Sequence, residues 1–247
     1  MFSPQQDQGR DGTRPPIEYA CLDEIPSRIT ILTRIDPHVE KDWPRWVERW
    51  VERDSGLLPL IIGGMKSRLD RYRFDGLVSV DASGSRIAAM LETSFWADRY
   101  YPKLWRVEKY EAGKAKQGRV VHRSYHYRNK DRLVIPWGPG DLSGKVILEI
   151  EDDFITGGTQ EAVVGDAVET GGASSVVVAV MLGWHDLHRV TSIAGRRIVF
   201  DVGDVGSALR NPTILPVIVG ATVLVTKDLD VDLKVILDYS VSFCIAS

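Results

Sequence analysis

Four carboxylates stand beside a threonine- and glycine-rich run in the middle of the chain. The carboxylates fall in segment 149–153 (EIEDD), which follows the apolar segment 146–148, and the run 156–159 (TGGT) comes next. Backbone amides of a glycine-rich loop at a helix N-terminus converge on anions, and threonine hydroxyls add donors. Carboxylates beside such a loop would repel phosphate, but they can accept hydrogen bonds from a sugar that carries it, or hold a metal ion. These residues therefore predict an anion site beside carboxylates that bind either the hydroxyls of a phosphorylated sugar or a metal ion.

Apolar segments that alternate with helical patterns must position this site. We expect strands at 74–80, 145–150 and 175–182, with helices at 86–95 and 159–170. Buried strands that alternate with helices in this way form a parallel sheet through βαβ connections. Ligands of such sheets bind at the carboxyl ends of the strands, which is where the acidic segment would lie. The expected architecture is α/β, a mostly parallel sheet flanked by helices.

The remaining chain divides by composition into segments of different character. We expect a disordered tail at 1–16, an N-terminal helical segment at 17–71, the α/β core at 72–183 and a β-rich C-terminal extension or hood at 184–247. The tail is polar and has almost nothing apolar to offset its ordering entropy.

Finer expectations concern the elements inside these segments. In the helical segment, apolar residues at helical spacing predict an amphipathic helix over 42–53 whose tryptophan stripe is core or a subunit contact. A second helix is expected over 57–73, and it begins either at the start of this segment or beyond Gly63-Gly64. Further strand-like segments are 103–110, 119–127, 196–202, 214–225 and 233–243.

Composition and charge narrow the function classes. The chain has 247 residues, 44% of them hydrophobic and 26% charged, which is typical of globular proteins. A net charge of −3 offers no basic field for nucleic acid, and no segment has the length of apolar chain that spans a membrane, so neither is an expected partner. Two cysteines form no disulfide framework and lack metal-site spacing, so we expect a reducing, cytoplasmic location.

The segment 144–159 (GKVILEIEDDFITGGT) resembles the ribose-phosphate-binding signature of type I phosphoribosyltransferases, most of all the orotate phosphoribosyltransferase branch. The signature is an apolar strand, two acidic residues, two apolar residues and a Thr/Gly loop. Two registers fit. In one the acidic pair is Glu151-Asp152, and Glu149, Asp153 and Ile155 depart from the pattern; in the other the pair is Asp152-Asp153, and Glu149, Glu151 and Gln160 depart. Asp152 is acidic in both.

Two earlier segments resemble other elements of the same family, in the same order. Leu77–Ala89 resembles the strand and loop whose amides hold pyrophosphate, with a tight loop at Asp81–Ser85. It departs from the family at Ser83 and Ser85, where the family frequently has basic residues and glycine. The basic segment 106–116 resembles a mobile loop that closes over the leaving pyrophosphate.

The resemblance implies an enzyme that transfers ribose 5-phosphate from phosphoribosyl pyrophosphate to a nucleobase or related nitrogen acceptor, and a homodimer. It implies catalytic roles for Glu151, Asp152, Lys109, Lys114 and Lys116. It implies substrate binding by Asp153, Thr156, Gly157, Gly158, Thr159, Ala82, Ser83, Gly84 and Arg106. Mg²⁺ would be the cofactor, held by Glu151 and Asp152 indirectly, through the metal-bound substrate.

Other interpretations stay open. The irregular Ser83 and Ile155 favour a non-catalytic regulatory protein that binds a nucleotide or phosphoribosyl pyrophosphate. A structural or assembly protein, with an incidental acidic loop, is a third hypothesis. Trp184, at the expected end of a strand, either stacks on a nucleobase as a substrate-binding residue or packs beneath the C-terminal strands. His185 and His188 show no evident third metal ligand.

Overall fold

The computed structural model describes residues 17–21, 29–34, 48, 51–53, 56–70, 72–95, 103–110, 119–122, 132–184, 190–200 and 205–226. Its strands are β1 (Ile17–Cys21), β2 (Ile29–Arg34), β3 (Gly76–Val80), β4 (Lys103–Tyr110), β5 (Arg119–His122), β6 (Arg132–Ile135), β7 (Val146–Phe154), β8 (Ser175–Trp184), β9 (Ser192–Ile193), β10 (Arg196–Phe200) and β11 (Ile214–Thr226). Its labelled helices are α2 (Leu57–Leu69), α3 (Asp81–Phe95), α4 (Gly158–Glu169) and α5 (Val205–Leu209).

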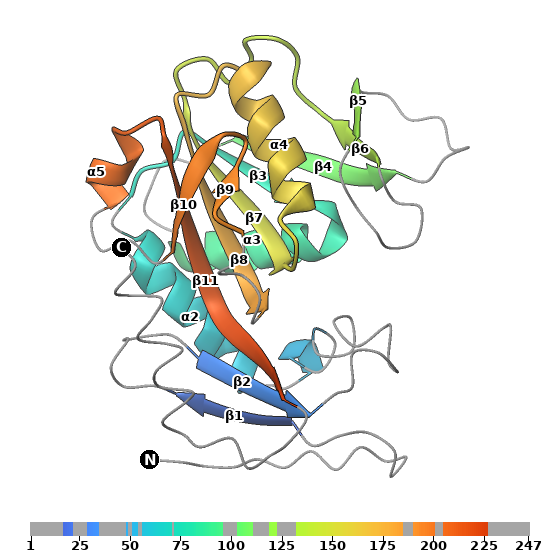
Figure 1. Ribbon diagram of the computed structural model, residues 1–247, viewed down its shortest axis with the longest axis vertical. Coiled ribbons are helices and arrows are strands. Elements are labelled where there is room, and N and C mark those ends of the chain that lie inside the picture. The colour runs from blue at the N-terminus through green and yellow to red at the C-terminus, as the bar shows by residue number, and fades with distance from the viewer. Residues whose placement is uncertain are drawn as a thin grey trace.

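One large sheet forms the centre of the molecule, in the order β1-β2-β11-β8-β7-β3-β4-β6-β5 (Figure 1). The strands from β2 through β11, β8, β7 and β3 to β4 pair in parallel. Antiparallel pairs occur where β1 joins β2, where β6 joins β4 and β5, and where β9 joins β10. The expected mostly parallel α/β sheet is therefore confirmed, with β7 in its interior.

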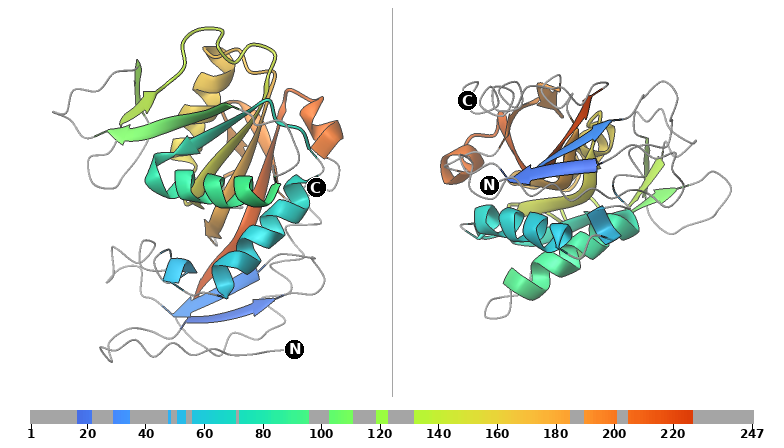
Figure 2. Two further views of the ribbon diagram at one scale, coloured as in Figure 1. Left: turned by 180° about the vertical axis from the view of Figure 1, so that it is seen from behind. Right: turned by 90° about the horizontal axis from the view of Figure 1, so that it is seen from below.

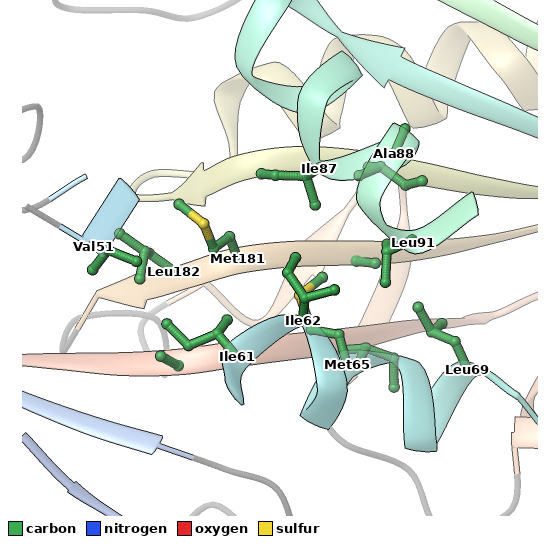
Figure 3. Packing of buried hydrophobic residues seen from close by; sticks show 14 of the residues in the cluster. Val51, Ile61, Ile62, Met65, Leu69, Ile87, Ala88, Leu91, Met181 and Leu182 are labelled. Atoms are coloured by element: carbon green, nitrogen blue, oxygen red, sulfur yellow. The ribbon is translucent and has the colours of Figure 1, made fainter. Parts of the chain in front are cut away.

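Helices cover both faces of the sheet (Figure 2). Alternate strand residues point to opposite faces, so Leu77 and Ile150 pack with α2 and α3, whereas Val78 and Ile147 pack with α4 on the other side. Figure 3 shows the first of these layers, where α2, α3 and β8 interlock through their aliphatic side chains. Both faces of the central strands are apolar, as expected for strands buried between two layers.

Helix α2 takes the earlier of the two starts that the sequence allows. It runs from Leu57, with Gly63 and Gly64 in its middle, rather than from beyond that pair. Pro59 stands in the first turn, where a helix needs no amide donor. The buried side chains of the first two turns, including Ile61, pack against the sheet, and this burial outweighs the helix-weakening effect of the glycines.

Helix α3 begins earlier than expected, because the tight loop predicted at 81–85 is helical. Asp81 makes the turn out of β3 in a left-handed conformation, with φ of 57°. A Cβ atom on Gly84 would lie 2.6 Å from the carbonyl oxygen of Ile150, so this glycine lets α3 lie directly on β7. Ser85 donates a hydrogen bond to the Asp81 carbonyl oxygen at 2.7 Å, within the helix. The small residues that suggest a loop serve close packing instead.

The two ends of the described chain meet in the sheet, which differs from the expected division into segments. Strands β1 and β2 lie in the N-terminal segment that we expected to be helical. Strand β11, which we placed in a C-terminal extension, pairs with β8 on one side and with β10 and β2 on the other. The β10 pairing ends at Val217 and the β2 pairing begins at Ala221; between them, Arg68 of α2 donates a hydrogen bond to the Val219 carbonyl oxygen at 2.7 Å.

Several expectations fall wholly or partly outside the described residues. These are the tail at 1–16, most of the helix at 42–53, the connection 111–118, the end of the strand at 119–127, the histidine segment 185–189 and the strand at 233–243. Of the 42–53 helix, Glu48 and residues 51–53 are described and helical, and Val51 is buried. Strand β6 was not predicted. Among the helices that the structure describes, none combines the length and apolarity needed to cross a membrane.

The packing of α2 on β11 predicts opposite effects for two glycine substitutions. A Cβ atom on Gly220 would lie 2.7 Å from both Ile61 Cγ2 and the Met181 carbonyl oxygen, whereas one on Gly63 would have no atom within 4 Å. We expect Gly220→Ala to lower the free energy of unfolding by about 1–3 kcal/mol. The matched control, Gly63→Ala, should raise it by about 0.5–1 kcal/mol, because alanine is the better helix former. Urea denaturation measures both, and equal stability of the two variants would contradict this packing.

Candidate functional site

The connections between strands run in opposite directions across the sheet on either side of the neighbouring strands β3 and β7. After β3 the chain moves outward to β4, and after β7 it moves outward to β8 on the other side. In open α/β sheets, ligands bind outside the carboxyl ends of the strands at such a switch point. Asp81 follows β3 there, and β7 continues to Phe154, beyond its expected end at Ile150. The acidic segment is therefore the carboxyl end of an interior strand rather than a loop.

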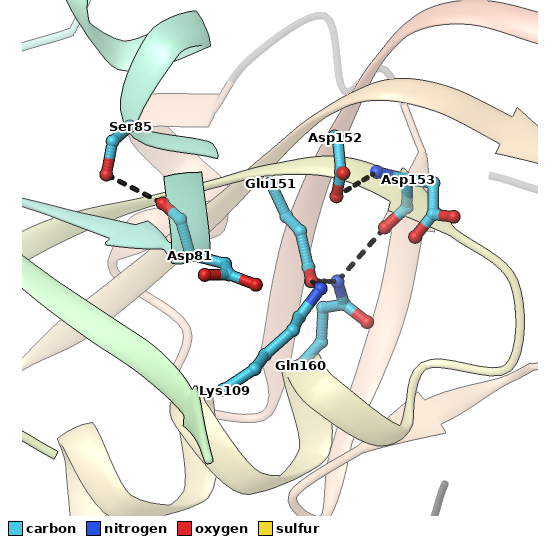
Figure 4. A network of polar contacts seen from close by, with 7 residues as sticks. All are labelled: Asp81, Ser85, Lys109, Glu151, Asp152, Asp153 and Gln160. Atoms are coloured by element: carbon cyan, nitrogen blue, oxygen red, sulfur yellow. Dashed lines mark hydrogen bonds and ion pairs between the residues drawn. The ribbon is translucent and has the colours of Figure 1, made fainter. Parts of the chain in front are cut away.

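A lysine and a glutamine hold Glu151 at this edge (Figure 4). Lys109 Nζ lies 3.0 Å from Glu151 Oε1, and the carboxamide of Gln160 donates to Glu151 Oε2. The same Gln160 nitrogen lies 3.4 Å from the carbonyl oxygen of Asp153. The side chains of Glu151 and Gln160 are 1% and 2% exposed, so the Glu151 carboxylate contacts protein groups rather than solvent.

The lengths of two strands bring Lys109 to Glu151. Strand β3 ends at Val80, opposite Val107 of β4, so Lys109 lies two residues beyond that end and its side chain reaches across to β7. Burial alone would lower the pKa of Lys109, but the charges of Glu151, Asp152 and Asp153 outweigh it and raise the pKa above its usual value. The lysine is therefore a permanent cation.

Glu149 lies deeper on the same face of β7. It is fully buried, and within the described part of the chain neither carboxylate oxygen has a hydrogen-bond partner. Burial, and then the charge of Glu151, raise the pKa of Glu149 well above its usual value, while Lys109 opposes them. Because an isolated buried carboxylate is costly, these surroundings favour the protonated form of Glu149 over the charged one.

The pKa values of two further carboxyl groups are raised in the same way. Burial raises the pKa of Glu151 to about 7; Lys109 opposes this shift, and Asp152 and Asp153 add to it. Burial, the charge of Asp152, and the charge and hydrogen bond of Glu48 raise the pKa of Asp153. The strand end thus holds more carboxylates than its lysine can neutralise.

Glu48, Asp152 and Asp153 form a second group, which we call the acidic trio. One carboxylate oxygen from each lies within 4.8 Å of the others. Asp152 is 7% exposed, and its Oδ1 accepts a hydrogen bond from the Asp153 amide at 3.1 Å. Carboxylate oxygens are the ligands that Mg²⁺ prefers in proteins, so the donor set of the trio fits this ion.

The TGGT run forms the entrance to α4. Thr156 is exposed, Gly157 caps the helix with φ of 74°, and Gly158 begins it. A Cβ atom on Gly157 would lie 3.2 Å from Ile193 Cδ1 and from Phe154 Cζ, so both backbone conformation and space favour glycine. The first turn of a twelve-residue helix attracts anions through its amide groups and dipole. Acidic segment and helix entrance are therefore adjacent, as the sequence predicts.

The two residues assigned to the start of a mobile basic loop lie in a strand instead. Arg106 and Lys109 both belong to β4, and only Lys109 reaches the acidic segment. Arg106 is exposed and pairs in register with Ser79 of β3. Because side chains alternate along a strand and Arg106 lies three residues before Lys109, the two face opposite sides of the sheet. Lys114 and Lys116 lie outside the described residues.

The predicted pyrophosphate loop is helical, and the tryptophan predicted to stack on a base is buried. Ala82, Ser83 and Gly84 belong to the first turn of α3, and Gly84 is buried against β7. Trp184 is 2% exposed and packs in the core cluster with α2 and α3, in line with the alternative of a packed tryptophan.

Sequence reasoning missed four residues of this site. Glu149 and Gln160 are only departures from the signature in the sequence. In the structure Gln160 donates a hydrogen bond to Glu151, and Glu149 interacts electrostatically with it. Glu48 lay on the polar side of an amphipathic helix, where charged residues are common. Asp81 directly follows β3, and its carboxylate is directed toward Lys109 and Glu151 in Figure 4. An acidic residue just after an apolar strand was the available signal for Asp81.

No family model and no curated protein sequence matches the chain. Solved structures are similar to it over about two thirds of its length or more. Adenine phosphoribosyltransferase from Thermoanaerobacter pseudethanolicus is 18% identical with a TM-score of 0.46, over 70% of this chain and 84% of that chain. APRTase from Giardia lamblia, complexed with 9-deazaadenine, is 13% identical with a TM-score of 0.47, over 70% and 82%.

A Neisseria gonorrhoeae protein with bound ppGpp is 15% identical with a TM-score of 0.42, over 75% of this chain and 93% of that chain. With scores and identities this low, the similarities carry no conclusion about function. The closer resemblance to the orotate branch stays a prediction.

The raised pKa of Glu151 predicts how stability depends on pH. Between about 4.5 and about 7, the folded protein holds a proton on Glu151 that the unfolded chain has released, so the free energy of unfolding falls as pH rises through this window. The full effect is on the order of 3 kcal/mol. Urea denaturation at pH 5 and pH 8 should show wild type losing stability relative to Glu151→Gln. Glu169→Gln, which removes an exposed carboxylate at the far end of α4 but keeps Glu151, is the control and should lose as much stability as wild type.

Proposed function

We propose that this protein binds a ribose 5-phosphate group at the carboxyl edge of β7 and transfers it from phosphoribosyl pyrophosphate to a nitrogen acceptor, a nucleobase or a related base. The observation that carries this proposal is one continuous segment. The carboxylates at the end of β7 lead, within three residues, into the glycine-capped first turn of α4 at the switch point of the sheet. A sugar phosphate has the two matching parts, hydroxyl groups and an anion.

The phosphate would lie against the amides of 156–159, at the positive end of the α4 dipole. Thr156 is exposed, so its hydroxyl can add a donor. Gly157 supports this role through its left-handed conformation, which shapes the entrance to the helix.

The ribose hydroxyls would donate to Asp152, which is acidic in both registers of the signature, and to Asp153. Glu151 is a weaker candidate for direct contact than we expected, because Lys109 and Gln160 occupy both of its oxygens. Positive charge develops on the anomeric carbon as its bond to pyrophosphate breaks and the bond to the acceptor nitrogen forms. A carboxylate beside the ribose would stabilise that charge.

Lys109 interacts electrostatically with Glu151, Asp152 and Asp153, and it would attract the pyrophosphate that leaves. Mg²⁺ would be held by the acidic trio or through the metal-bound substrate, and would supply charge neutralisation of the pyrophosphate. Lys114 and Lys116 keep their proposed role in closing the site.

A second function, binding without catalysis, is favoured by two specific observations. The segment expected to cradle pyrophosphate, Ala82–Gly84, is helical and packed against β7. Lys109 is already paired with Glu151. Under this alternative the protein binds phosphoribosyl pyrophosphate or a nucleotide as a regulatory ligand.

Two measurements separate the alternatives. Release of pyrophosphate during incubation with phosphoribosyl pyrophosphate, Mg²⁺ and a panel of bases would support transfer. A rise in melting temperature with the same ligand, without release in the presence of any base, would select binding alone. No stabilisation and no release would reject both.

The cradle can be tested by changing its glycine. We expect Gly157→Val to lose affinity for ribose 5-phosphate by at least about tenfold, because valine disfavours φ of 74° and its Cβ would press on Ile193 and Phe154. Calorimetric titration measures the affinity. Gly140→Val is the control, since Gly140 also has positive φ but lies in the turn before β7, with no atom within 4 Å of a Cβ. Unchanged affinity in Gly157→Val would place the phosphate elsewhere.

The acidic segment can be tested by removing one charge. Asp152→Asn keeps the shape and one acceptor, so we expect turnover to fall roughly ten- to a hundred-fold, the effect of losing about 1.5–3 kcal/mol from a charge-assisted hydrogen bond. Ligand affinity should fall much less, because the charge matters most when the sugar becomes positive. Steady-state kinetics and a melting curve give both quantities. An equal kcat for variant and parent would show that Asp152 does not contact the reacting sugar.

A further inference from the structure

Gln160 connects the two halves of the proposed site. It stands in the first turn of α4, directly after the TGGT run, and its side chain points back to β7 (Figure 4). Its amide nitrogen donates to Glu151 Oε2 and lies 3.4 Å from the Asp153 carbonyl oxygen. The two contacts fall on either side of Asp152.

The chemistry of this contact requires a carboxamide. One NH₂ group supplies two hydrogens, which suits one carboxylate oxygen and one carbonyl oxygen. A glutamate in this position would repel Glu151, and an apolar side chain would leave a buried carboxylate oxygen without its donor. Gln160 is 2% exposed, so water does not replace it readily.

Glu151 is also held from the other side, by Lys109 at 3.0 Å. With the Glu151 side chain and the Asp153 carbonyl both tied to α4, the backbone at Asp152 has little freedom relative to the first turn of that helix. A sugar phosphate that spans the two elements depends on this spacing, because its hydroxyls and its phosphate are joined covalently.

We propose that Gln160 is a positioning residue that sets the acidic end of β7 relative to the anion-binding turn of α4, and so makes the site prefer a phosphorylated sugar to phosphate alone. This inference rests on the proposed function, since it assumes that one ligand contacts both elements. It assigns a role to a residue that departs from the family signature.

The experiment compares two ligands, inorganic phosphate and ribose 5-phosphate, by calorimetric titration. Wild type should bind ribose 5-phosphate more tightly. Gln160→Met, which keeps the length but removes both donors, should leave the affinity for phosphate unchanged and weaken ribose 5-phosphate by about tenfold, the weight of one hydrogen bond to a charged group. Val164→Ala, a buried change on the same helix, lowers stability without this change in preference.

A second variant guards against misfolding. Gln160→Asn keeps the carboxamide but retracts it by one methylene, so it should give the same loss of preference with less disturbance of the core. An unchanged preference in both variants, or an equal loss for both ligands, would overturn the positioning role while leaving the proposed function intact. Equal affinity of wild type for the two ligands would instead reject the proposed function, and this inference with it.

Discussion

The ion pair between Lys109 and Glu151 is the interaction on which the carboxyl edge of the sheet depends. An interior strand that ends in four carboxylates would not be stable without compensation, because each buried charge loses its hydration. Lys109 and Gln160 contact the two oxygens of Glu151, and burial raises the pKa of Glu149 beneath it, which favours its uncharged form. The remaining carboxylates, Asp152 and Asp153, stand at the end of the strand, beside the entrance to α4.

Close contacts between layers hold this arrangement in place. Gly84 lets α3 lie on the backbone of β7, and Gly220 lets α2 lie on β11. In both cases a missing side chain brings a helix near enough to fix the strand beneath it. The acidic segment therefore extends from a strand that α3 contacts directly, while the TGGT run leads into α4, which covers the opposite face. A ligand at this edge would meet groups from both layers.

The sequence predicts the local elements of the site better than their long-range connections. The apolar runs of β3, β7 and β8 and the helix after Thr159 are visible because each has a simple period and clear end signals. The early start of α3 was hidden, since serine and glycine favour loops until a neighbouring strand requires a close approach. The Lys109–Glu151 pair was also hidden, because it depends on β4 and β7 flanking β3 in a particular register. Strands β1 and β2 were missed because each is short, and because β2 pairs with the distant strand β11 and β1 pairs with β2.

The exchange of partners along β11 has a consequence for how the chain can be shortened. A fragment that begins at 72 keeps every strand of the predicted core. It lacks β2 and Arg68 of α2, which donates a hydrogen bond to the Val219 carbonyl oxygen. The outer side of the carboxyl half of β11 would then be a bare edge of β-branched residues, and such edges promote aggregation. Strand β2 and helix α2 therefore protect this edge of β11, and expression trials should retain them.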